Sequence, residues 1–240
     1  ETIMVTIESI IIGIVFILIQ LYALTIVERS PIGEQKLLSL SGGVAIAYMF
    51  IYILPTLHKK QEEFGGSLAL DTELYFLGLL GLLVYFSVYS FAQTKAAAHL
   101  TELTVYMVQA SFFMVYSFII SYVVFSTDVK RVESLFYGLA ISLHFMGWSY
   151  HLGKKHHRLH KNRGRYMLAG ATFLGSIMGV FGPSSGLLIE SMIAFSSGAM
   201  LFNVISKELP FEKHAHLPTF LISSLVYAAT MIALKAFFDW

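Results

Sequence analysis

Long apolar runs separated by short polar segments make up almost the whole chain. Eight runs can be read, at residues 7–27, 36–57, 72–93, 103–125, 132–152, 166–182, 187–206 and 218–238. Each approaches the roughly 20 apolar residues that a helix needs to cross a bilayer. The runs are continuously apolar, whereas strands of a membrane barrel alternate apolar and polar residues. The pattern predicts an all-α integral membrane protein with eight transmembrane helices, in which residues 1–240 form a single transmembrane domain.

The composition supports this class. Of the 240 residues, 56% are hydrophobic and 13% are charged, and the mean hydropathy is +0.70. A soluble domain carries roughly 25% charged residues, so a soluble globule is excluded. Cysteine is absent, which excludes thiolate metal sites and disulfides. The net charge of +1 indicates no nucleic-acid partner, and the lipid bilayer is the expected partner.

Lysine and arginine concentrate in the loops after the first, third, fifth and seventh runs. The loop between the fifth and sixth runs carries most of them, namely Lys154, Lys155, Arg158, Lys161, Arg163 and Arg165. Basic loops stay on the cytoplasmic side of a membrane, so both termini are expected on the extracytoplasmic side of a plasma or inner membrane. The same loop is expected to contact anionic lipid headgroups.

A pattern in the second run recurs in the seventh run. At a constant offset of 155 residues, Ser41, Gly43, Leu54 and Pro55 match Ser196, Gly198, Leu209 and Pro210. The repeat units, about 1–93 and 164–240, are separated by the fourth and fifth runs at about 100–152. They would therefore cross the membrane in opposite directions, as in the inverted repeats of many transporters. The alternative is chance, because small residues and a terminal proline are common in membrane helices.

The repeated segments resemble a known family. Gly42-Gly43-Val44-Ala45-Ile46, followed by Ile53-Leu54-Pro55, is similar to the second helix of the ZIP divalent-metal transporters. Ala194-Phe195-Ser196-Ser197-Gly198-Ala199, followed by Lys207-Glu208-Leu209-Pro210, is similar to their seventh helix. The resemblance implies a ZIP-like 3+2+3 helix bundle with an inverted repeat. It also implies a homodimer, or a partner in a membrane complex.

The family's metal-binding motifs are largely replaced. Its fourth helix carries His-Asn-x-x-acid-Gly, where this chain has Tyr116-Ser117-Phe118-Ile119-Ile120-Ser121. In the fifth helix His144 is present, but Phe145 and Trp148 stand in place of two acids. The resemblance leaves His144, Ser117 and Tyr116 as candidate metal donors, whereas zinc sites use about four ligands. Either the site is rebuilt from other residues, or the protein does not handle metal as the family does. No cofactor is expected, and a divalent metal would be a substrate.

Four other polar residues are candidates for a solute pathway, namely Asn203, Gln109, Glu102 and His99. Glu102 and His99 share a helical face, and ionisable residues inside a membrane are often functional. The alternative for this pair is a position at the membrane boundary. Uncharged polar residues in spans usually form interhelical hydrogen bonds. Asn203 also aligns with Tyr48 in the repeat, which favours a shared site at the midplane.

Two classes of function remain open. The first is a divergent transporter that moves a divalent metal or another small solute by alternating access around His144, Ser117, Tyr116 and Asn203. The second is a ZIP-derived accessory or structural subunit that does not transport. Enzyme activity is not expected, because no nucleophile elbow, paired zinc-binding histidines or phosphate loop is present. Polar residues that converge on a cavity would favour the transporter, and a dry aromatic interior would favour the subunit.

Overall fold

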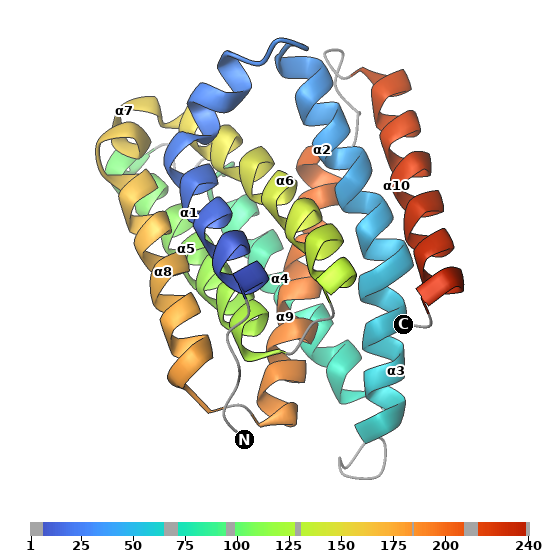
Figure 1. Ribbon diagram of the computed structural model, residues 1–240. Helices are drawn as coiled ribbons and strands as arrows, with labels where there is room; N and C mark the ends of the chain where they lie inside the picture. The colour runs from blue at the N-terminus through green and yellow to red at the C-terminus, as the bar shows by residue number, and fades with distance from the viewer. Residues whose placement is uncertain are drawn as a thin grey trace.

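The computed structural model describes residues 7–64, 72–94, 99–127, 131–183, 185–208 and 216–238, and within these ranges it contains helices and turns but no strand (Figure 1). The helices are α1 (Ile7–Glu28), α2 (Glu34–Tyr48), η1 (Met49–Ile53), α3 (Leu54–Phe64), α4 (Glu73–Phe91), α5 (Glu102–Ser126), α6 (Arg131–Lys155), α7 (His157–Leu159), η3 (His160–Gly164), α8 (Arg165–Phe181), α9 (Gly186–Asn203), η4 (Val204–Glu208) and α10 (Leu217–Phe238). A helix lies at each of the eight predicted ranges, so the all-helical class is confirmed.

Six helical segments among the described residues are long and apolar enough to cross a membrane. They are Ile7–Glu28, Glu34–Glu63, Glu73–Phe91, Glu102–Ser126, Gly186–Ser206 and Leu217–Phe237. Of the other two long helices, α8 has 17 residues, which is at the lower limit of the roughly 17–25 residues of a membrane-spanning helix. Helix α6 carries His144, Ser142 and Ser149, all buried against other helices. The chain therefore has the helices of a multi-pass membrane protein, but the structure supports six candidate spans where the sequence predicts eight.

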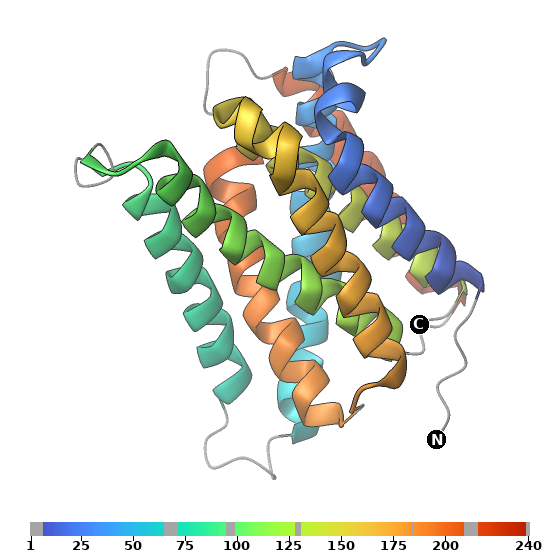
Figure 2. The same cartoon turned by 90° about the vertical axis from the view of Figure 1, so that its left-hand side faces the viewer.

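The helices pack in two groups. In the first group α1 packs on α6 and α8, and α5 packs on α8; Figure 2 shows α8 lying along α5. In the second group α2 packs on α10, and α4 packs on α9. The groups meet where α2 contacts α6 and where α5 contacts α9. This boundary contains the cavities described below.

The ends of the helices define two ends of the bundle. Helices α1, α4 and α6 finish at the upper end in Figure 1, where α2, α5 and α8 begin. The start of α1 and the end of α10 both lie toward the lower end. The basic segment between α6 and α8 is therefore at the opposite end from the two outermost helix ends.

Two glycines allow unusually close helix contacts. A methyl group at Gly43 of α2 would collide with the backbone carbonyl of Phe220 in α10. A methyl group at Gly198 of α9 would collide with the backbone carbonyl of Gly78 in α4. Small residues are used in this way where membrane helices approach closely. Gly43 and Gly198 are the repeat positions 155 residues apart.

Helices α2 and α9 each continue into a wider π-helical turn. These turns are η1, at Met49–Ile53, and η4, at Val204–Glu208. They are also separated by 155 residues, the offset of the predicted repeat. The matched residues Leu209 and Pro210 lie outside the described residues. π-helical turns are rare and occur frequently at functional sites.

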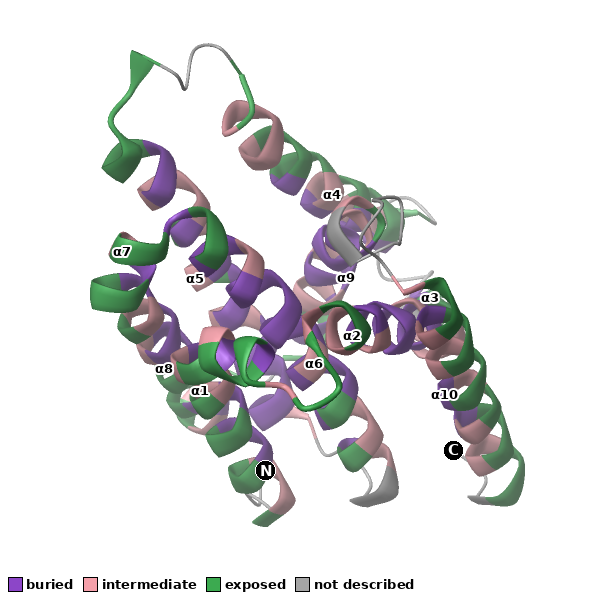
Figure 3. Ribbon diagram, turned by 90° about the horizontal axis from the view of Figure 1, so that it is seen from above, coloured by how far each residue is buried: buried purple, intermediate pink, exposed green. Residues whose placement is uncertain are grey.

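Large apolar side chains cover the outward faces of α1, α4 and α10. Leu225 on α10 is 69% exposed, Phe76 on α4 is 59% exposed, and Ile11 on α1 is 53% exposed. Figure 3 shows exposed residues on the outer sides of these helices and buried residues toward the centre. An apolar surface of this extent fits contact with lipid rather than with water.

Candidate functional site

A cavity of about 540 Å³ lies between the two helix groups. Its wall is made by α2, η1, α3, α9 and α10 on one side and by α5 and α6 on the other. Charged residues from the lower ends of the helices line its mouth, namely Lys59, Lys60, Glu133, Glu190 and Lys235. Its inner end is formed by Tyr48, Tyr116, Ile141 and Met200. The cavity thus extends from the lower end of the bundle into its interior.

Three tyrosines form one wall of this cavity. The rings of Tyr48 and Tyr52 stack with their centroids 5.3 Å apart, and Tyr137 meets Tyr48 edge-on at 5.7 Å. The hydroxyl of Tyr52 donates to Oε1 of Glu133 at 2.5 Å. This bond ties η1, from one helix group, to α6 from the other.

Lys235 is held by a backbone carbonyl of η1 that lies four residues before a proline. Pro55 has no backbone N–H, so the carbonyl of Ile51, four residues earlier, cannot receive a standard helical hydrogen bond from it. Nζ of Lys235 donates to this oxygen at 2.9 Å and lies 5.6 Å from the ring centroid of Tyr52. Through this bond the side chain of Lys235 from α10 lies on the wall of the large cavity.

Two buried polar atoms on the cavity wall lack a hydrogen-bond partner among the described residues. They are Oη of Tyr48 and Oε2 of Glu190. Tyr48 is 0% exposed and Glu190 is 7% exposed. The other oxygen of Glu190 lies 3.4 Å from Nζ of Lys60. Buried polar groups are normally satisfied, but both atoms have almost no accessible surface, so a solute in the cavity would reach them only after neighbouring side chains move.

The three candidate metal donors do not converge on one point. Nε2 of His144 lies 3.0 Å from Oη of Tyr116, and this pair is buried at the inner end of the cavity. Ser117 lies on another face of α5, where its hydroxyl accepts a hydrogen bond at 3.1 Å from Nε2 of Gln20 in α1. Among the described residues, no three His, Cys, Asp or Glu side chains are grouped so that they could hold a metal ion.

Stacked aromatic rings lie beyond Tyr116. Phe113 stacks on Trp148 with their centroids 4.1 Å apart, and Tyr85 stacks on Phe112 at 4.8 Å. Phe112 also stacks on Tyr116 at 6.1 Å. These five rings, here called the aromatic layer, fill the interior between the large cavity and the upper half of the bundle.

A second, smaller cavity of about 50 Å³ lies on the other side of the aromatic layer. It is lined by Tyr85, Tyr89, Gln93, Gln109, Phe113, Trp148, His151, Leu152, Lys155 and Asn203. The hydroxyl of Tyr85 donates to Oδ1 of Asn203 at 2.5 Å. Two predicted pathway residues, Asn203 and Gln109, are therefore in this upper cavity and not in the large one.

Neither models of protein families nor curated protein sequences match this chain. Function is therefore inferred from the geometry of the two cavities.

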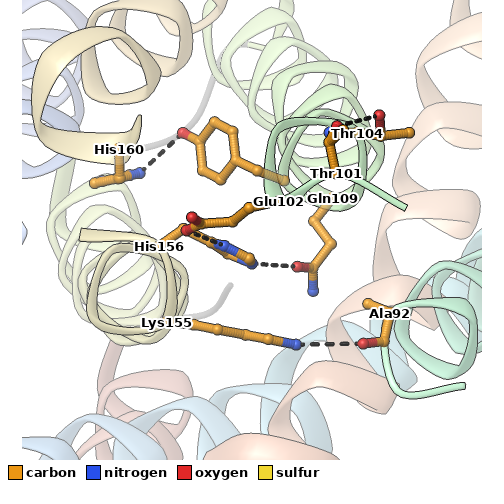
Figure 4. A network of polar contacts seen from close by, with 9 residues as sticks. Ala92, Thr101, Glu102, Thr104, Gln109, Lys155, His156 and His160 are labelled. Atoms are coloured by element: carbon orange, nitrogen blue, oxygen red, sulfur yellow. Dashed lines mark hydrogen bonds and ion pairs between the residues drawn. The ribbon is translucent and has the colours of Figure 1, made fainter. Parts of the chain in front are cut away.

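The predicted pathway residues Glu102 and Gln109 are linked by a histidine. Nδ1 of His156 lies 3.2 Å from Oε1 of Glu102, and Nε2 lies 3.3 Å from Oε1 of Gln109 (Figure 4). His99 is exposed ahead of α5 and does not take part in this contact. The expected pairing of His99 with Glu102 is thus replaced by a contact with His156, 54 residues away in the sequence.

The predicted basic segment occupies the upper end around α7. Lys154 pairs with Glu34, Lys155 donates to the carbonyl of Ala92 at 3.4 Å, and Nη2 of Arg165 donates to the hydroxyl of Tyr166 at 2.7 Å. The others are exposed, namely Arg158, Lys161 and Arg163. The expected contact of these basic residues with lipid headgroups stays a prediction.

Several residues of the site were not among the sequence candidates. They are Tyr52, Glu133, Tyr137, Lys235 and His156. Glu133 and Lys235 are charged residues inside predicted spans, so the rule that marks Glu102 as a candidate would also have marked them. The tyrosines carry no such signal, because aromatic residues are common throughout this chain.

Proposed function

We propose that this chain is a multi-pass membrane transporter that moves a small organic solute by alternating access. The observation that carries the proposal is the cavity of about 540 Å³ between the two helix groups, whose wall combines apolar side chains with polar ones such as Thr56, Glu133 and Lys235. Sites for small molecules are typically pockets of about 300–1,000 Å³ with mostly apolar walls and a few polar groups. The small upper cavity lies on the opposite side of the aromatic layer, where the solute would leave.

The charges around the large cavity argue against a bare divalent cation as the solute. Lys59, Lys60 and Lys235 contribute three positive charges, whereas Glu133 and Glu190 contribute two negative charges. A positive surplus repels cations, and zinc sites need several converging donors. A neutral or anionic organic molecule fits the cavity better in both charge and size.

We also propose the ZIP-like 3+2+3 arrangement with an inverted repeat. It is supported by the helices at all eight predicted ranges and by the π-helical turns and close-contact glycines at matched positions. In this proposal the lower end faces outward with both termini, and the basic segment around α7 faces the cytoplasm.

The second candidate function is a structural or accessory subunit without transport. The aromatic layer favours it, because five stacked rings close the interior where a solute would have to pass. The two candidates differ in whether this layer ever opens.

Cysteine accessibility distinguishes them. The chain contains no cysteine, so Ser197→Cys on the wall of the large cavity introduces a single thiol. Reconstituted protein would be exposed to a membrane-impermeant thiol reagent from each side in turn. A transporter that alternates exposes this thiol to both sides, and labelling from the lower end alone would overturn the transport proposal. Thr94→Cys, exposed at the upper end, identifies the sidedness of each preparation, and the cysteine-free parent gives the background.

Metal transport is tested separately by Zn²⁺ uptake into liposomes that contain the protein. The expected result is uptake equal to that of empty vesicles. Uptake that disappears in His144→Ala would contradict the organic-solute proposal and restore the metal hypothesis.

A further inference from the structure

His156 lies at the turn between α6 and α7, at the upper end of the bundle, and its side chain contacts α5. It directly follows α6, precedes α7 and is 5% exposed. Its two contacts, Glu102 and Gln109, lie on α5 seven residues apart, which is two turns along one face. The side chain of Thr101 caps α5 by accepting from the backbone N–H of Thr104 at 3.2 Å, which fixes the helix start next to Glu102 (Figure 4).

The protonation state of the ring determines how many of these contacts are hydrogen bonds. A neutral imidazole has one N–H donor and one acceptor nitrogen, whereas an imidazolium has two donors. Both ring nitrogens of His156 face oxygen atoms, from the carboxylate of Glu102 and the amide of Gln109. The protonated ring donates to both oxygens, and the bond to the carboxylate is charge-assisted. The neutral ring keeps both contacts only if the Gln109 amide turns to present its NH₂ group.

The turn at His156 also lies next to a contact between the two helix groups. Lys155, the residue before His156, donates to the carbonyl of Ala92 at the end of α4. Lys155 and Gln109 both line the upper cavity. The Lys155 bond runs from α6 to the residue that follows α4, so a separation of these two helices at the upper end would break it. Because the contacts of His156 fix the end of α6 against α5, they also hold the neighbouring Lys155 in position for its bond to Ala92.

We propose that His156 is a proton-binding site whose occupancy keeps the upper cavity narrow, and that its release of the proton allows this cavity to widen at the upper end. The inference rests on the proposed transport function. It adds that the opening of the upper cavity is coupled to the release of a proton. Among the described residues, the titratable and charged groups next to the ring are Glu102 and Tyr106 from α5, Lys155 from α6, His157 from α7 and His160 from η3. Glu102 is the carboxylate in direct contact with the ring, and it accepts a charge-assisted hydrogen bond when the ring is protonated.

The test measures access to the upper cavity as a function of pH. Leu152 lines this cavity and is 4% exposed, so Leu152→Cys in the full-length protein reports opening by its rate of labelling from the upper end. Each rate is divided by that of Thr94→Cys at the same pH, which removes the pH dependence of the thiol itself. The ratio is expected to rise about tenfold between pH 5.5 and pH 8, the effect of losing one charge-assisted hydrogen bond.

Three variants in the Leu152→Cys background identify the group responsible. His156→Gln is expected to give a high ratio that does not change with pH. Glu102→Gln, at an exposed position, removes the carboxylate that accepts the charge-assisted hydrogen bond and is expected to give a smaller change of the ratio with pH. His157→Gln changes the exposed neighbouring histidine and is expected to keep the parent behaviour.

A flat ratio in the parent, or a pH dependence that survives His156→Gln, would overturn the proposal. The result is separable from that of the Ser197→Cys experiment. If Ser197→Cys is labelled only from the lower end while Leu152→Cys still responds to pH through His156, the transport proposal fails and the proton site stands.

Discussion

At the level of single residues, Tyr116 and His144 form a buried polar pair between α5 and α6. Tyr116→Phe removes the hydroxyl 3.0 Å from Nε2 of His144 and weakens the hydrogen bonding of a fully buried ring. The expected loss in the free energy of unfolding is about 1–3 kcal/mol, measured by denaturant unfolding in detergent. Tyr22→Phe, at an exposed position on α1, is the matched control. An equal effect in the two variants would show that the pair does not stabilise the fold.

A second residue, His160, makes stability depend on pH. Burial, together with the nearby positive charge of Arg165, lowers the pKa of His160 to about 4. The unfolded chain, with an ordinary histidine pKa near 6.5, takes up a proton between pH 6.5 and 4 that the folded protein does not bind. The contribution to stability is therefore complete above pH 6.5 and falls as the pH is lowered toward 4. Between pH 7.5 and 5.0 the expected loss from this residue is about 2 kcal/mol.

The measurement compares the free energy of unfolding of the parent and of His160→Gln at pH 7.5 and at pH 5.0. The variant is expected to lose less stability on acidification, because it cannot take up the proton in the unfolded state. Equal losses in the two proteins would contradict the assignment to His160.

At the level of helices, the close contact of α9 with α4 depends on Gly198. Gly198→Ala places a methyl group against the carbonyl of Gly78, which forces the two helices apart and is expected to cost about 1–3 kcal/mol. Gly170→Ala in α8 is the control, because nothing lies within 4 Å of the added carbon. It is expected to stabilise the protein by up to about 1 kcal/mol through helix propensity. Thermal unfolding of the two variants gives the comparison, and a destabilised Gly170→Ala with an unaffected Gly198→Ala would refute the contact argument.

The positions of the helices were predictable because apolar runs of span length have few alternatives in a membrane protein. The π-helical turns were not, since Met49–Ile53 has the same apolar composition as the α-helix before it. The wall of the large cavity depends on how the helices are rotated about their axes. Tyr52 and Glu133 are 81 residues apart, and nothing in either local sequence indicates that they face each other. Tyr116 and His144 were predicted together from a family resemblance, and the structure does place them in contact.

At the level of the whole molecule, the apolar outer surface predicts where charge is tolerated. Leu225 lies near the middle of α10 and is 69% exposed, so Leu225→Arg places a cation in the hydrocarbon core. The expected cost of insertion is about 2.5–3.5 kcal/mol. Leu217→Arg, at the exposed start of the same helix, is expected to cost far less because the side chain reaches the interface. The share of folded protein in the membrane fraction measures the difference, and equal yields would contradict a lipid-facing α10.

The two π-helical turns also bear on how the bundle changes shape. Such a turn holds one residue more than an α-helical turn, so tightening it to an α-helix rotates the following segment by about 100° and advances it by about 1.5 Å. Turn η1 carries Tyr52 and Ile53 on the wall of the large cavity, and η4 begins directly after Asn203 in the upper cavity. Each cavity thus has, in its own wall, a helical turn that can change its length and twist. A change in one wall can be absorbed within a single helix, without stretching any of the loops that join the helices.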